Sequence, residues 1–115
     1  MRQIEWGYLR KNCTSCDRAR EFFAEHDLQV TDQVDARAVP LADADALQLV
    51  NQVDQLYVTR GVKVLHFDLA QERPDNPALL ELLIGRSGKL RAPAVKQNRT
   101  LVVGFDRTVY ERVFQ

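Results

Sequence analysis

Apolar and polar residues follow each other in short regular patterns that predict alternating strands and helices. The first residues alternate between the two kinds, which predicts a strand over residues 3–8. Apolar residues then recur at steps of three and four, which predicts an amphipathic helix over residues 14–27. A short apolar segment at residues 30–35 predicts a second strand. Strand, helix and strand in this order indicate a βαβ unit.

The middle of the chain carries weaker patterns. Pro40 is expected to open a helix with an acidic first turn and an apolar stripe that ends near Val53. Two β-rich runs, residues 56–59 and 62–67, lie on either side of Arg60-Gly61. They indicate either a hairpin or a bent pair of strands.

The last third contains clearer signals. Asn76 is expected to cap a helix that has Pro77 at its first position and stops at Gly85. Residues 90–95 and 101–103 are typical of an antiparallel pair of strands. A final amphipathic helix is predicted to follow them.

Composition limits the kind of protein this chain forms. Its 115 residues suit one domain, residues 1–115, and 45% apolar content argues against disorder. Sixteen basic residues balance sixteen acidic ones, so we expect no nucleic-acid partner and no anionic membrane surface. No apolar run has the length of a signal peptide or a bilayer span, which favours a cytoplasmic location. The sequence leaves the oligomeric state open.

Both cysteines lie in one motif, Cys13-Thr14-Ser15-Cys16, between the first predicted strand and helix. Two thiols at this spacing can close and reopen a small disulfide ring, which is typical of a redox pair. The amides and dipole of a helix N-terminus favour a thiolate, so Cys13 is the candidate nucleophile and is expected to be exposed. Cys16, one turn further in and more buried, would resolve a mixed disulfide.

Other interpretations of this motif are a half zinc site, an iron–sulfur cluster shared by two chains, or inert cysteines. A zinc site needs two more ligands, and His26 lies about 15 Å along the helix from Cys16. His66 lies within an apolar run and is interpreted as a structural strand residue. We therefore expect no metal and no cofactor.

Polar neighbours of the thiols have two interpretations each. The hydroxyls or amides of Thr14 and Ser15 either donate to the Cys13 thiolate or simply cap the helix. Arg10 and Lys11 either attract an anionic substrate and favour the thiolate, or are solvated loop residues.

The order of predicted elements matches the thioredoxin architecture, and the residues resemble the arsenate reductase and Spx family. The likeness rests on the Cys13–Cys16 motif, the following Arg18-Ala19-Arg20 and the segment Leu90-Arg91-Ala92-Pro93. The segment Val103-Gly104-Phe105-Asp106 is more similar to glutaredoxin-like proteins. The resemblance implies an α/β thioredoxin-like fold with a four-stranded mixed sheet flanked by helices. It also implies an arsenate-reductase-type insertion between the second and third core strands.

The same resemblance implies that Pro93 follows a cis peptide bond beside the cysteines. The backbone at Ala92 would then pair with an extended substrate segment. The alternative is a trans proline at the start of an edge strand. Arsenate reductases of this type carry an arginine immediately before the proline, where this chain has Ala92, and Arg91 precedes it by one residue.

The resulting functional prediction is a thiol–disulfide oxidoreductase that acts on protein or low-molecular-weight thiol and disulfide substrates. Cys13 and Cys16 would be catalytic, and a further set would contact substrate: Thr14, Ser15, Arg91, Ala92 and Pro93. One alternative is an arsenate reductase, although those enzymes use a single cysteine in this loop. Another is an Spx-like redox-sensing transcriptional regulator that binds RNA polymerase. The double glycine with which glutaredoxins hold glutathione is missing, because Phe105 follows Gly104.

Overall fold

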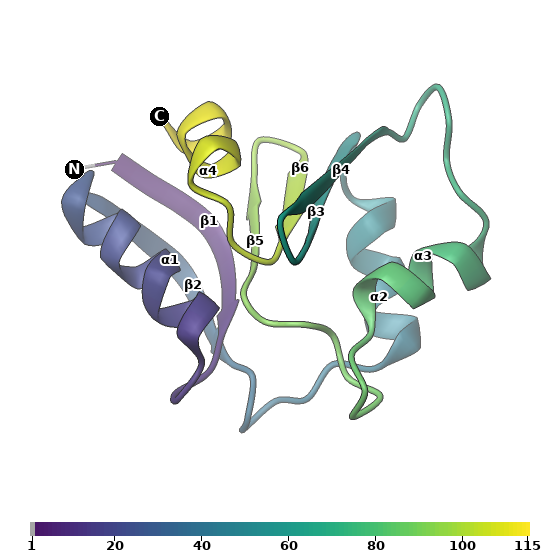
Figure 1. Ribbon diagram of the computed structural model, residues 1–115, viewed down its shortest axis with the longest axis horizontal. Helices are drawn as coiled ribbons and strands as arrows, with labels where there is room; N and C mark the ends of the chain where they lie inside the picture. Colours follow the sequence, from purple (N-terminus) through teal and green to yellow (C-terminus); the bar gives the residue numbers. More distant parts are fainter. Residues whose placement is uncertain (1) are drawn as a thin grey trace.

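The computed structural model describes residues 2–115 as a mixed β-sheet with helices on both faces (Figure 1). The strands are β1 (Arg2–Leu9), β2 (Leu28–Asp35), β3 (Gln55–Arg60), β4 (Lys63–Asp68), β5 (Ala94–Gln97) and β6 (Thr100–Val103). The helices are α1 (Thr14–Glu25), α2 (Asp43–Asn51), α3 (Asn76–Leu83) and α4 (Arg107–Phe114).

The strands are ordered β2-β1-β5-β6-β3-β4 across the sheet. β1 and β2 are parallel, as the predicted βαβ unit requires, and β5 pairs antiparallel with both β1 and β6. The predicted hairpin is confirmed as β3 and β4, and β3 pairs parallel with β6.

The expected four-stranded sheet is wrong, because six strands are present. The physical reason lies in β3, where Leu56 and Val58 are buried on one face of the sheet and Tyr57 on the other. A strand that is apolar on both faces needs cover on both, and an isolated hairpin is only marginally stable in water. β3 therefore joins the main sheet beside β6 and brings β4 with it.

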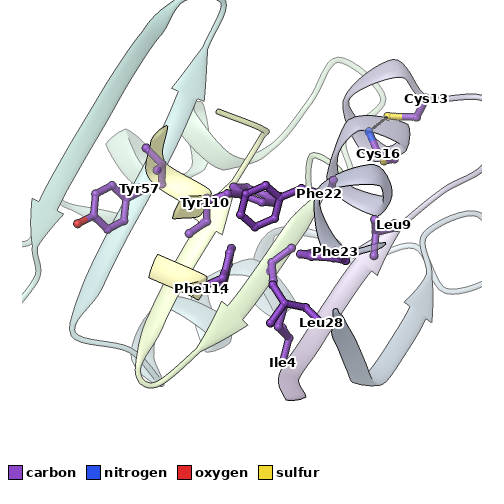
Figure 2. Close-up of a cluster of buried hydrophobic side chains, with 14 residues drawn as sticks. Ile4, Leu9, Cys13, Cys16, Phe22, Phe23, Leu28, Tyr57, Tyr110 and Phe114 are labelled. Carbon is purple, nitrogen blue, oxygen red and sulfur yellow. Dashed lines mark hydrogen bonds between the residues drawn. The ribbon is translucent and has the colours of Figure 1, made fainter. Parts of the chain in front are cut away.

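The two faces of the sheet have separate cores. On one face, α1 and α4 contribute an aromatic cluster that includes Phe22, Phe23, Tyr110 and Phe114 (Figure 2). The Tyr110 ring is in edge-to-face contact with Phe22 and Phe114. On the other face, α2 and α3 pack against apolar residues of β3 and β6. Among residues 2–115, no helix is long and apolar enough to span a bilayer.

Three predicted boundaries are wrong. Asp75 rather than Asn76 caps α3, because the Asp75 carboxylate accepts a hydrogen bond from the Ala78 amide at 3.0 Å. α2 begins at Asp43, three residues after Pro40. Residues 90–93 form no strand, because the Leu90 and Arg91 amides donate to the carbonyl groups of Leu41 and Leu83 instead of to a neighbouring strand.

Candidate redox site

The Cys13 thiol caps the N-terminus of α1. The chain leaves β1, passes through Asn12 in the left-handed region (φ 57°), and enters the helix from an extended Cys13. Asn tolerates this backbone conformation better than most residues. The Cys13 sulfur accepts a hydrogen bond from the Cys16 amide at 3.3 Å, drawn as a dashed line in Figure 2. The predicted position of Cys13 at a helix start is confirmed.

The Cys13 thiol is less exposed than the sequence suggested. Cys16 is 0% exposed, as expected, but Cys13 is only 7% exposed, so the expectation of an openly exposed first thiol is wrong. Burial raises the pKa of the Cys16 thiol to about 12, and the neighbouring Cys13 adds to this effect. Cys16 is therefore a neutral thiol at physiological pH, which leaves Cys13 as the group able to act first.

The Ala92-Pro93 segment covers Cys13, and the register of the sheet explains how it reaches that position. Tyr8 of β1 is opposite Ala94 of β5, so Ala92 lies just past the end of β1, where the cysteine loop begins. The Cys13 thiol lies 3.9 Å from the Ala92 carbonyl oxygen, to which it donates. The Ala92-Pro93 peptide bond is cis, as predicted. Within residues 2–115 the Ala92 amide donates to no other group.

Arg91 is held away from Cys13. Its guanidinium donates to the Thr59 carbonyl at 2.7 Å and to the Leu82 carbonyl at 3.3 Å, so it links β3 to the end of α3. Burial lowers its pKa, and the charge of Arg60 adds to this. Even so, an arginine stays protonated in proteins. In this structure Arg91 joins two elements of the fold.

Thr14 and Ser15 occupy the first turn of α1 between the two cysteines. The helix cap is the Cys13 sulfur itself, and neither hydroxyl makes a hydrogen bond within the described chain. Thr14 is exposed and Ser15 half-buried. Both side chains are therefore available to a molecule that approaches Cys13.

The two histidines lie apart from the thiols in other contacts. The His26 ring packs against Phe22, with 4.2 Å between ring centroids, and its Nδ1 lies 2.9 Å from the Gln115 amide nitrogen. The His66 ring stacks on Tyr57 at the same centroid distance. In the part of the chain that the structure describes, no three His, Cys, Asp or Glu side chains are placed to hold a metal ion.

A basic cavity of about 600 Å³ lies beside the Ala92-Pro93 segment, and sequence reasoning missed it. Its wall carries five cationic side chains and no carboxylate: Arg10, Arg37, Arg86, Lys89 and Arg91. The loops after β1, β2 and α3 supply these residues, and all three loops lie at the bottom of the molecule in Figure 1. The basic turn at residues 86–89 was the signal available in the sequence, but the net charge of zero concealed the local excess of positive charge.

Comparisons with known proteins agree with this architecture. The chain is 26% identical over 102 residues to the regulatory protein MgsR of Bacillus subtilis, covering 86% of this chain and 81% of MgsR. It is 24% identical over 103 residues to the global transcriptional regulator Spx of Streptococcus mutans, covering 86% and 74% of the two chains. The solved structure of the YFFB protein superposes with a TM-score of 0.59 at 21% identity, covering 96% of this chain and 98% of that one.

These matches bear out the resemblance seen in the sequence, since the fold is consistent with a thioredoxin-like one and the relatives span most of the chain. The model of the ArsC family matches residues 8–113, from the end of β1 to the last turn of α4. That stretch includes the cysteine motif, the cis-proline segment and all of strands β2, β3, β4, β5 and β6. This chain belongs to the ArsC family.

Proposed function

We propose that this protein is a thiol–disulfide oxidoreductase in which Cys13 attacks a substrate disulfide and Cys16 resolves the product. The observation that carries the proposal is the placement of Cys13 as the cap of α1, with its sulfur 3.3 Å from the Cys16 amide. An amide donor and a helix N-terminus stabilise a negative sulfur. The second thiol, one helical turn away, has a pKa that burial raises to about 12, so it is protonated at physiological pH.

The chemistry proceeds in two exchanges. In the first, the Cys13 thiolate bonds to one sulfur of the substrate disulfide, and the other sulfur leaves with the electron pair and takes a proton from solvent. In the second, the Cys16 sulfur bonds to the Cys13 sulfur, and the bond between Cys13 and the substrate breaks. The proton lost by Cys16 passes through solvent to the departing substrate sulfur, which leaves as a thiol. The substrate disulfide is reduced by two electrons and the Cys13–Cys16 pair is oxidised. An external thiol then reduces the pair again.

Cys13 and Cys16 lie close together, because the Cys13 sulfur is 3.3 Å from the backbone nitrogen of Cys16, and C-x-x-C pairs of this kind can close a disulfide. The contact groups proposed for substrate surround Cys13: Thr14 and Ser15 on the helix, and Ala92 and Pro93 on the facing loop. The free Ala92 amide is suited to pair with an extended segment of substrate. Arg91 would act here indirectly, by holding the loop.

The test is to trap the first intermediate. The Cys16→Ser variant, incubated with a disulfide substrate, is expected to accumulate a stable mixed disulfide on Cys13 that intact mass spectrometry detects. The Cys13→Ser variant is the matched control and should form no adduct. Equal labelling of both variants would contradict the proposed roles.

The names of the two curated relatives favour a second candidate, a redox-sensing transcriptional regulator. In that case the same cysteine pair would act as a switch, and RNA polymerase would be the partner that the Spx resemblance implies. A pull-down with RNA polymerase subunits under reducing and oxidising conditions separates the candidates, since a regulator binds stably and an enzyme forms only transient mixed disulfides. Arsenate reduction is less well supported, because Ala92 stands where those enzymes have an arginine, and the Arg91 guanidinium binds the Thr59 and Leu82 carbonyls instead.

A further inference from the structure

The basic cavity continues beyond the neighbourhood of Cys13. A second cavity of about 310 Å³ adjoins it and shares three of its residues, Gly85, Arg86 and Arg91. The second cavity adds Arg60 and one carboxylate, Glu81. Together they form a groove, called the basic groove below, which runs from the loop after β1 to the hairpin end of β3.

The cations of the basic groove are not neutralised by the protein. Within the described chain, the side chains of Arg10, Arg37, Arg86 and Lys89 are exposed and make no ion pair or hydrogen bond. The ion pairs found in residues 2–115 lie elsewhere: Asp17–Arg20, Asp54–Arg99 and Glu25–Arg107. Asp35, the last residue of β2, accepts a hydrogen bond from the Arg37 backbone amide at 3.0 Å and makes no ion pair with these cations. A hollow lined by unpaired cations concentrates anionic ligands.

The groove lies close to the thiol. Ala92 lines the larger cavity, and its carbonyl oxygen lies 3.9 Å from the Cys13 sulfur. Arg10, which also lines it, precedes Cys13 by three residues. A molecule lying along the groove would therefore have one end at the cis-proline loop, next to the free Ala92 amide.

This geometry identifies a class of substrate. We propose that the basic groove binds an extended acidic segment of a protein substrate and delivers a neighbouring cysteine of that protein to Cys13. This inference rests on the proposed function. Two adjoining cavities suit an extended chain better than a small anion, and the free Ala92 amide suits a polypeptide backbone. The groove also lies next to a thiol, whose disulfide chemistry requires a sulfur that nucleic acids lack.

The experiment uses two synthetic peptides of equal length, each with a single cysteine activated as a thiopyridyl disulfide. In one peptide a run of aspartates precedes the cysteine, and in the other asparagines replace them. Attack by the Cys13 thiolate bonds it to the peptide sulfur and releases pyridinethione, which is followed by absorbance. The readout is the ratio of the acidic-peptide rate to the neutral-peptide rate at low ionic strength.

We expect the acidic peptide to react faster, by about tenfold or more, in the range that electrostatic steering produces. The combined Arg86→Glu and Lys89→Glu substitutions, in an exposed turn, should abolish this preference. The combined Lys63→Glu and Arg112→Glu substitutions change the net charge equally at exposed positions outside the groove and should retain it. High salt should reduce the preference in the wild-type protein.

Three results would overturn the inference. The first is equal rates for the two peptides, and the second is an equal loss of preference in both charge-reversed proteins. The third concerns a small dianionic disulfide, dithiobis(nitrobenzoate). If the Arg86→Glu and Lys89→Glu protein lost as much rate toward it as toward the acidic peptide, the groove would be assigned to small anions. A separate assay with uncharged dithiodipyridine tests the proposed function itself. If that function is wrong, wild-type protein will react with this reagent no faster than Cys13→Ser protein.

Discussion

The burial of Cys16 predicts a large and measurable loss of reactivity when it is the only thiol present. The perturbation is Cys13→Ser, which leaves Cys16 alone in the interior. Its pKa of about 12, against an ordinary value of 9.0, is caused first by loss of hydration in the core and then by Cys13. The leading cause remains in the variant.

The size of the effect follows from the two pKa values. At pH 8 a thiol with a pKa of 9.0 is about one-tenth thiolate, whereas one with a pKa of about 12 is ionised in about one molecule in ten thousand. Folded Cys13→Ser protein should thus react with iodoacetamide more slowly than the same chain in urea, by up to about a thousandfold, since the substitution removes the smaller contribution of Cys13 to the raised pKa. Cys16 is also 0% exposed, which slows it further.

The assay follows the alkylated fraction by mass spectrometry in folded and in urea-denatured Cys13→Ser protein between pH 8 and pH 10. The folded rate should rise about tenfold per pH unit without a plateau, while the denatured rate levels off above about pH 9. Restricted access alone would lower the rate but keep the plateau. A plateau near pH 9 in the folded protein, or a rate close to that of the denatured chain, would refute the argument from burial.

Three further predictions concern stability. Asp75→Ala should lower the free energy of unfolding by about 1 kcal/mol in urea titrations, because it removes the cap of α3. The Asn76→Ala control should lower it by less, and equal losses of stability would contradict the assigned cap. Gly104→Ala should cost more than about 1 kcal/mol, since Gly104 has φ +92° and an added Cβ would lie 2.9 Å from Thr59 Cβ; an unchanged melting temperature would contradict it. The reduced protein should lose stability as pH rises from about 9 toward 12, because the folded state holds the Cys16 proton more tightly than the unfolded chain. Cys16→Ser should lose less, and parallel pH profiles would argue against a raised pKa.

The parts of the fold that sequence patterns predicted are those whose signals are local. The alternation in β1, the helical period of α1 and the cysteine motif between them each lie within one short segment of the sequence. The β3–β4 hairpin was also visible. Its membership in the main sheet was not, because the pairing of Leu56 with Leu101 joins positions far apart in the chain.

The candidate site shows the same division. The position of Cys13 at a helix start follows from its own neighbourhood, but its burial depends on a carbonyl 79 residues away. The basic groove could not be predicted for a similar reason. Arg10, Arg37 and Lys89 come from three separate loops, and only the folded sheet edge brings them together. The sequence predicted that Arg91 contacts substrate, whereas its hydrogen bonds place it between β3 and α3.

The central claim is that Cys13 and Cys16 alternate between a dithiol and a disulfide. The most direct measurement is to treat the reduced wild-type protein with a disulfide oxidant, quench it in acid, alkylate the remaining thiols, and determine the intact mass and the cross-linked peptide. The account predicts that both thiols disappear together and that a Cys13–Cys16 disulfide forms with no retained adduct. A lasting adduct on Cys13 beside a free Cys16, or two thiols that stay reduced, would contradict it.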